Sequence, residues 1–191
     1  MKPKLSILIA TIPGREEQSK ALSEKLANQI GNLPVEYLIL SDNRKRSIGA
    51  KRQALWDIAE GEYAAMVDDD DDISDNYIEE LLKATETGAE VITFEQRAIY
   101  NGLESKVIFK LGQGDHAFIP NGITLRDAWH VCAWRLDRVK DCQFLYCNYG
   151  EDKAWSLQAR QQARTSFHIP MVLHTYRHDA ETTAAPEPNG V

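Results

Sequence analysis

Short apolar runs alternate with amphipathic stretches through the first half of the chain. The runs are continuous, as in strands buried on both faces, and predict strands at residues 5–10, 35–42, 62–67 and 89–96. The stretches between them predict helices over residues 15–30, over 47–61 with Gly61 as the C-cap, and from an N-cap at Ser74 to about residue 87. This order predicts an α/β fold with a mainly parallel central sheet flanked by helices.

The second half of the chain has a less regular pattern. It predicts strands at residues 105–112 and 130–137, a loop over 120–130, a helix over 150–163, and a closing strand with a loop at 167–178. From Glu181 onward the residues are small and polar with two prolines, which is typical of a disordered tail. No repeat or linker divides the chain. We therefore expect one domain over residues 1–180, with halves at 1–97 and 98–180, and a tail over 181–191.

Polar residues stand where three of the predicted strands end. Thr11, Asp42 and the five consecutive aspartates at positions 68–72 all lie at predicted carboxyl ends. Ligands bind beyond this edge in open parallel sheets. Five adjacent negative charges repel one another, so they need either full solvation or a positive partner. Carboxylate oxygens are suited to Mg²⁺ or Mn²⁺, and the pattern predicts a ligand-binding edge.

Composition narrows the class of protein. The chain has 191 residues and a formal net charge of −7, which disfavours broad, nonspecific nucleic-acid binding. Its three cysteines include no CxxC pair, which argues against a disulfide framework or a zinc site and favours reduced thiols in a cytoplasmic protein. The first apolar run is too short to cross a bilayer, and we expect no transmembrane segment.

The aspartates at positions 68–72 have several interpretations. Acidic runs are usually solvated turns, but a buried strand brings this one to the ligand-binding edge. An EF-hand loop is excluded because Ile73 stands where the loop requires glycine. A phosphatase of the haloacid-dehalogenase type carries DxD followed by Thr or Val after its first strand. Here Asp72 takes that place after the third strand, so a metal-dependent phosphotransferase or phosphohydrolase stays a weaker alternative. A non-catalytic nucleotide-binding module is the other.

Four segments in order carry a broader resemblance: "ILIATIPGR", "LILSD", "IGAKRQALWDIAEGEYAAMVDDDDDIS" and "NYGEDKAWSL". In these the chain resembles the family 2 glycosyltransferases, which have a Rossmann-like GT-A fold. The resemblance extends over about residues 4–178 and is most specific at 49–77. Gln53 departs from the family pattern, which has Asn there. The family's DxDD falls on Asp68, Asp70 and Asp71, and a register shifted by one residue is the alternative.

The resemblance implies a metal-dependent transfer of a sugar from a nucleotide-diphosphate donor, most simply a UDP-sugar. It implies that Asp70 binds Mn²⁺ or Mg²⁺ and that Asp68 binds the ribose or the metal, with Asp69 and Asp71 as close alternatives. His174 lies in the region after the catalytic base where some members place a histidine ligand. The first half of the chain would then bind the nucleotide sugar.

Further donor-binding residues follow from the same resemblance. Thr11 and Asp42 match positions that contact the base and ribose. Arg52 matches the family arginine near the base or diphosphate. Lys51 is adjacent to it, and Arg15 follows the first strand. Each of these side chains also has an ordinary structural explanation, such as a strand end or a surface charge.

The second half would then bind the acceptor and supply the base. In "GEDK", Asp152 matches the family's catalytic base, with Glu151 beside it, and the expected transfer is inverting. Acidic residues are also favoured at a helix start by the helix dipole alone. The sequence leaves the acceptor open among a saccharide, a protein, a small molecule and a modified DNA base. It also leaves the oligomeric state open.

Overall fold

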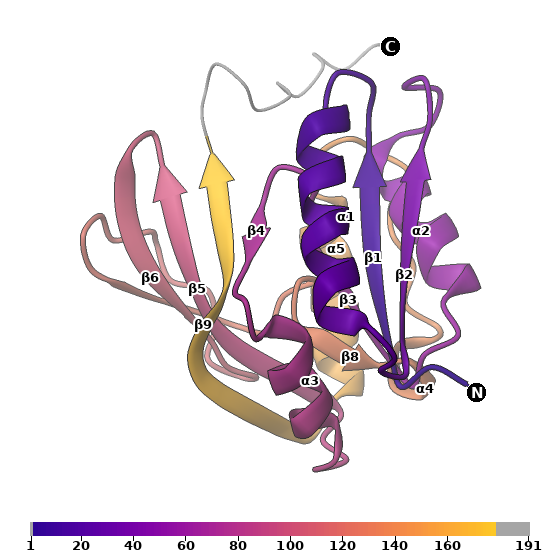
Figure 1. Ribbon diagram of the computed structural model, residues 1–191. Helices are drawn as coiled ribbons and strands as arrows, with labels where there is room; N and C mark the ends of the chain where they lie inside the picture. The colour runs from indigo at the N-terminus through magenta and orange to yellow at the C-terminus, as the bar shows by residue number, and fades with distance from the viewer. Residues whose placement is uncertain (1, 179–191) are drawn as a thin grey trace.

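A nine-stranded sheet runs through the middle of the computed structural model, which describes residues 2–178 (Figure 1). Its strands are β1 (Leu5–Thr11), β2 (Val35–Ser41), β3 (Tyr63–Met66), β4 (Asp72–Ile73), β5 (Val91–Tyr100), β6 (Leu103–Phe109), β7 (Ile123–Arg126), β8 (Ala133–Arg135) and β9 (Ser166–His178). The α/β class and the single-domain fold are confirmed. The predicted tail over residues 181–191 lies outside the described residues.

Five helices in the described part of the chain cover both faces of the sheet. They are α1 (Glu16–Ile30), α2 (Ile48–Ile58), α3 (Tyr77–Thr85), α4 (Leu136–Val139) and α5 (Glu151–Gln162). In Figure 1, α1 and α3 lie in front of the sheet, whereas α2 and α5 lie behind it. The helix predicted over residues 15–30 forms as α1, and Leu22, Leu26 and Ile30, four positions apart, make a buried stripe on it.

The sheet is mixed, so the prediction of a mainly parallel sheet is only partly correct. Its main strand order is β2-β1-β3-β8-β5-β6-β7, and β1 is parallel to both β2 and β3. The short strand β8 lies between β3 and β5 and is antiparallel to both. The strand predicted at residues 130–137 corresponds to β8, but its place between β3 and β5 depends on pairing with distant segments, which local sequence periodicity does not reveal.

The last strand, β9, pairs with two strands that are not otherwise hydrogen-bonded to each other, β5 and β4. It runs parallel to β5 with register shifts around Glu95, and it pairs antiparallel with β4. This second pairing sets Ile73 opposite His174 and Asp72 opposite Thr175. A histidine near the end of the chain is thereby brought beside the aspartates that follow β3.

Aromatic packing fixes α5 against α2. Trp155 stacks on Phe144 with ring centroids 5.0 Å apart, and Trp56 meets Trp155 edge-on at 4.7 Å. Trp134 of β8 also packs edge-on against Trp155 and is fully buried. This cluster holds the first turn of α5, with Glu151 and Asp152, next to α2.

Three local predictions were wrong. The helix after the aspartates begins at Tyr77 with Asn76 as its N-cap, because the backbone N–H of Ser74 donates to Leu173 and extends the β4–β9 pairing. Helix α2 ends at Ile58, and Gly61 is not its cap. A Cβ on Gly61 would lie 2.6 Å from the Ser6 hydroxyl, so close packing requires this glycine. The expected loop over residues 120–130 contains strand β7.

Candidate active site

The predicted site residues gather at the carboxyl edge of the sheet, where β1, β2 and β9 point upward in Figure 1. Thr11 ends β1, Asp42 follows β2, and the aspartates follow β3. The N-terminus of α5 reaches the same edge, because Arg52 of α2 contacts both Asp68 and Glu151. Segments separated by about a hundred positions in the sequence therefore meet at one place.

Arg52 is the central cation of this edge. Its two terminal nitrogens lie 2.6 Å from a carboxylate oxygen of Asp68 and 2.6 Å from one of Glu151. The Arg52 side chain is 6% exposed and that of Glu151 is 5% exposed, so the ion pair is shielded from water. Desolvation opposes ionisation of Asp68, but the Arg52 charge outweighs it and lowers the pKa of Asp68 to about 2.

Asp69 is saturated by contacts inside the protein. It accepts hydrogen bonds from the Thr11 hydroxyl at 2.7 Å and from Arg15 at 2.6 Å, and it is buried. The other terminal nitrogen of Arg15 lies 3.0 Å from Asp70. The Asp70 side chain is 31% exposed, and desolvation together with the charge of Asp68 raises its pKa above the ordinary value. Asp70 is thus the more accessible of these two neighbours.

Asp71 and His174 form a buried pair. The Nε2 atom of His174 lies 3.3 Å from Asp71 Oδ2, and both side chains are almost fully buried. Desolvation raises the pKa of Asp71 well above its ordinary value, with further contributions from Asp68 and Asp70. Desolvation lowers the pKa of His174 to about 4, so this imidazole is neutral near pH 7. Its Nδ1 is 2.9 Å from the Gln96 amide nitrogen.

Lys51 and Asp42 join the ends of β1 and β2. The buried ammonium of Lys51 donates to the Thr11 carbonyl at 2.9 Å and lies 3.4 Å from Asp42. The Asp42 carboxylate also accepts the backbone N–H groups of Arg44 and Arg46. Desolvation opposes ionisation, but the Arg46 N–H and the Lys51 charge outweigh it and lower the pKa of Asp42. These contacts fix the polar groups that follow β1 and β2.

Asp152 is the least engaged carboxylate of the site. Its side chain is 30% exposed, and one oxygen accepts the backbone N–H of Lys153. His130 lies 4.0 Å away, measured from Nδ1 to an Asp152 carboxylate oxygen. A carboxylate that projects from the first turn of a helix and keeps its second oxygen free can accept a proton from a bound hydroxyl.

A metal ion finds suitable ligand types here but no complete cage. Within residues 2–178, no three His, Cys, Asp or Glu side chains are placed to hold an ion together. Asp68 and Asp70 offer partly exposed carboxylates, whereas Asp71 and His174 are buried as a pair. Mg²⁺ is commonly held by one or two carboxylates plus substrate phosphates and water. The exposed pair fits that kind of binding.

Three contributors were missed by the sequence reading. Lys25 of α1 lies 3.0 Å from Asp72, so Asp72 is ion-paired in β4 and not simply a solvated charge. Gln96 contacts His174, and His130 approaches Asp152. A single lysine, glutamine or histidine forms no recognisable sequence motif. Only the tertiary packing of α1, β9 and β8 brings these side chains to the site.

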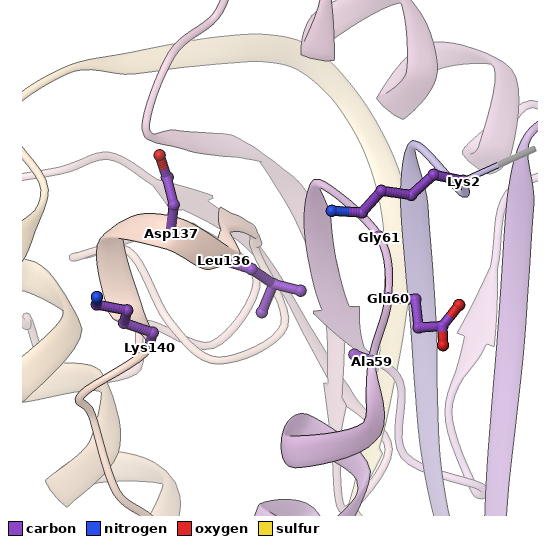
Figure 2. Close-up of a pocket in the computed structure, with 7 residues that line it drawn as sticks. All are labelled: Lys2, Ala59, Glu60, Gly61, Leu136, Asp137 and Lys140. Carbon is purple, nitrogen blue, oxygen red and sulfur yellow. The ribbon is translucent and has the colours of Figure 1, made fainter.

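A separate hollow of about 550 Å³ lies at the opposite edge of the sheet (Figure 2). It is lined by Lys2, Ala59, Glu60, Gly61, Leu136, Asp137 and Lys140. Gly61 precedes β3, whereas the aspartates follow that strand, so none of the predicted site residues reaches this hollow. Its opposite charges give it no clear ligand preference.

This fold, with a cluster of carboxylates at the carboxyl edge and the antiparallel strand β8 between β3 and β5, is that of the GT-A glycosyltransferases. The family model described as glycosyl transferase family 2 matches residues 14–135, and the chain belongs to that family. The predicted resemblance and fold class are therefore confirmed. No curated protein sequence matches the chain significantly.

Solved structures with the same fold include the S. aureus protein TarS. The crystal structure of TarS 1-349 superposes with a TM-score of 0.65 at 16% sequence identity, covering 91% of this chain and 60% of that one. The same fragment in complex with UDP-GlcNAc gives 0.66 at 15% identity, covering 92% and 59%. The complex with UDP gives 0.65 at 16%, covering 93% and 61%. This chain thus spans about three fifths of those structures.

Proposed function

We propose that this protein transfers a sugar from a nucleoside-diphosphate sugar to an acceptor hydroxyl. The observation that carries the proposal is the Arg52 bridge, which ties Asp68 after β3 to Glu151 beside the open carboxylate of Asp152. Transfer needs a place where the leaving diphosphate is held and a base within reach of the attacking hydroxyl. The two halves of that arrangement meet at this bridge.

A UDP-sugar is the proposed donor. In support, TarS has the same fold and has been crystallised with UDP-GlcNAc and with UDP. Asp42 and Lys51 are proposed to hold the nucleoside. Thr11 and Arg15 are proposed to support the same binding site through their hydrogen bonds to Asp69. The cation of Arg15 is also close enough to Asp70 to move onto a phosphate once one binds.

Asp70 and Asp68 are proposed to hold Mn²⁺ or Mg²⁺ against the diphosphate. The bound ion would supply positive charge that offsets the charge developing on the leaving group. Binding would draw Asp68 and Asp70 away from Arg52 and Arg15. Asp71 and His174 are also proposed as metal ligands. Their buried contact with each other would have to break before they could bind the ion.

Asp152 is the proposed general base of an inverting transfer. One Asp152 oxygen accepts the Lys153 N–H and the other accepts no hydrogen bond within residues 2–178, so a hydroxyl can bind there and lose its proton as it attacks. Glu151 is buried and pairs with Arg52 through one carboxylate oxygen, and we propose that it positions the first turn of α5. Near pH 7 Arg52 stays protonated, because the charges of Asp68 and Glu151 outweigh the effect of desolvation and raise its pKa.

The cellular setting is also a proposal. Among the described residues, no helix is both long and apolar enough to cross a bilayer. Cys132, Cys142 and Cys147 are free thiols, which is the state expected in the reducing cytoplasm. The acceptor stays open among a saccharide, a protein, a small molecule and a modified DNA base.

The test is UDP binding and UDP release. Titration calorimetry should show UDP binding that strengthens with Mn²⁺, and UDP-GlcNAc should release UDP in the presence of Mn²⁺, slowly to water and faster with a suitable acceptor. Chelation with EDTA should abolish release. Hydrolysis of p-nitrophenyl phosphate without UDP binding would instead support the phosphohydrolase alternative. UDP binding without release across an acceptor and donor screen would support the non-catalytic module.

A further inference from the structure

His130 is the most unusual buried polar group of the molecule. It lies in the turn before β8 and is 4% exposed. Both of its ring nitrogens are buried without a hydrogen-bond partner, and no other side chain within residues 2–178 leaves two buried polar atoms unpaired. Buried polar groups are almost always satisfied, and leaving one unpaired costs about 1–3 kcal/mol. His130 therefore sits where a partner is expected.

The surroundings of His130 point to that partner. The nearest carboxylate is Asp152, at 4.0 Å from the Nδ1 atom, and one Asp152 oxygen is not otherwise bonded. An approach of about 1 Å between these two atoms would bring them to hydrogen-bond length. Desolvation, and then the nearby charge of Arg52, lower the pKa of His130 to about 4. The ring is thus a neutral donor near pH 7, with one N–H and one lone pair.

We infer that His130 is a positioning residue that donates its Nδ1–H to Asp152 and orients that carboxylate toward the acceptor hydroxyl. The inference rests on the proposed role of Asp152 as the base. The turn that carries His130 is fixed, since the Cys132 N–H donates to the Trp129 carbonyl and β8 pairs with both β3 and β5. The imidazole is rigid, whereas Asp152 is held only by its own helix turn. A rigid neutral donor limits the directions in which the carboxylate can point.

The first test needs no substrate. In ¹⁵N-histidine-labelled full-length protein, long-range ¹H–¹⁵N spectra report which ring nitrogen carries the proton, and the His130→Asn variant assigns the signal. We expect the Nδ1–H form for His130, although free histidine in water favours Nε2–H. Asp152→Ala should shift His130 toward Nε2–H. An Nε2–H form in both proteins would overturn the inference.

The second test uses the geometry of the amide side chains. Asparagine places its amide nitrogen near the Nδ1 position of histidine, whereas glutamine places it near Nε2. With UDP-GlcNAc and Mn²⁺, His130→Phe should lower kcat for UDP release by about 10- to 100-fold without changing KM for the donor. His130→Asn should recover most of the rate and His130→Gln should not. Thermal unfolding and UDP affinity of each variant control for folding.

A double-mutant comparison separates this inference from the proposed function. If His130 acts through Asp152, His130→Phe should have little further effect in an Asp152→Asn background. An equal loss in both backgrounds would overturn the inference while leaving the base in place. Full activity of Asp152→Asn itself would instead overturn the proposed base. Normal activity of all three His130 variants beside an inactive Asp152→Asn would overturn only the inference.

Discussion

The two ends of the candidate site differ in how their charges are satisfied. After β3, the aspartates are paired with Arg52, Arg15 and Lys25, and Asp69 also accepts the Thr11 hydroxyl. At the start of α5, Asp152 keeps an oxygen free. The first end, which we call the closed end, is organised by the protein itself. The second, the open end of Asp152 and His130, keeps polar atoms without a hydrogen-bond partner within residues 2–178.

The difference shows that packing alone can assign similar carboxylates to different tasks. Some stabilise the fold through ion pairs, and others stay available for a reaction. Removal of a cation at the closed end should lower the free energy of unfolding, because it leaves buried carboxylates unpaired. Changes at the open end should be felt mainly in the rate of transfer. Each prediction below compares those two readouts.

The largest effect is expected at the open end. Asp152→Asn should lower UDP release from UDP-GlcNAc by about 10²- to 10⁴-fold, because the amide cannot accept the acceptor proton. The melting temperature should stay close to that of the wild type. Glu79→Gln on the exposed face of α3 is the matched control and should leave both measurements unchanged. A fully active Asp152→Asn would show that the open end does not control the rate of transfer.

At the closed end, Arg52→Met should destabilise the fold by about 3–5 kcal/mol, because it leaves the carboxylates of Asp68 and Glu151 enclosed without a cation. The free energy of unfolding in urea measures this. The control is Arg97→Met, which breaks the exposed pair with Glu104 and should cost at most about 1 kcal/mol. Equal losses for the two variants would show that the closed end is not tightly organised.

The open end should also give a pH signature. The pKa of His130 is lowered to about 4, so between roughly pH 6.5 and 4 the unfolded chain binds a proton that the folded chain does not. Stability from this group is therefore lost as the pH falls through that window, by about 1.36 kcal/mol per unit of pKa difference.

Other groups also contribute to the pH dependence, including the neutral His174, whose pKa is also lowered, and Asp71, whose raised pKa acts in the opposite direction. The difference in unfolding free energy between the wild type and His130→Asn isolates the contribution of His130. We expect that difference to change between about pH 7 and pH 4, in favour of the wild type at the higher pH. A constant difference would mean that the pKa of His130 is the same in the folded and unfolded chains.

A smaller effect is expected where the open end is supported. A Cβ on Gly49 would lie 1.8 Å from the backbone carbonyl oxygen of Leu145 and 3.1 Å from the Cβ of Glu151. Gly49→Ala should therefore displace the segment leading into α5, cost about 1–3 kcal/mol and slow transfer. Ala54→Gly in the same helix should cost about 1 kcal/mol through helix propensity and leave transfer unchanged. An unchanged rate of transfer in Gly49→Ala would show that the position of the segment around Leu145 does not affect the reaction.

The smallest effect is expected at the outer margin of the closed end. Lys25 lies 3.0 Å from Asp72, whose side chain is 47% exposed. Lys25→Ala should cost at most about 1 kcal/mol, and the loss should shrink as salt is added. Urea unfolding at low and high ionic strength checks both points. A loss of several kcal/mol that salt leaves unchanged would extend the closed end outward to Asp72.

Most of the first half was predictable from its pattern. The strands that became β1, β2 and β3 and the first two helices are short local elements whose apolar periodicity is strong. Errors gathered where distant pairing decides local structure. The N–H of Ser74 bonds to Leu173, which removes Ser74 from the helix start, and β8 enters between β3 and β5 from a segment far along the chain.

The sequence predicted which residue types would gather at one edge of the sheet. The match over residues 14–135 confirms that the chain belongs to the family. Their individual roles stay predictions. The sequence alone determined that carboxylates would end the third strand and begin the helix at "GED", because strand and helix periodicity are local properties. It could not rank the five aspartates, since neighbouring identical residues carry no information about which way each one faces.

The tertiary structure alone decided that ranking. Arg15, Arg52, Lys25 and His174 reach different aspartates because α1, α2 and β9 pack against the edge from different sides. The same packing left Asp152 open beside His130. Ion pairing and burial depend on distances between segments that are remote in the chain. The sequence therefore specifies which chemistry is present, and the fold decides which of its groups remain free to use it.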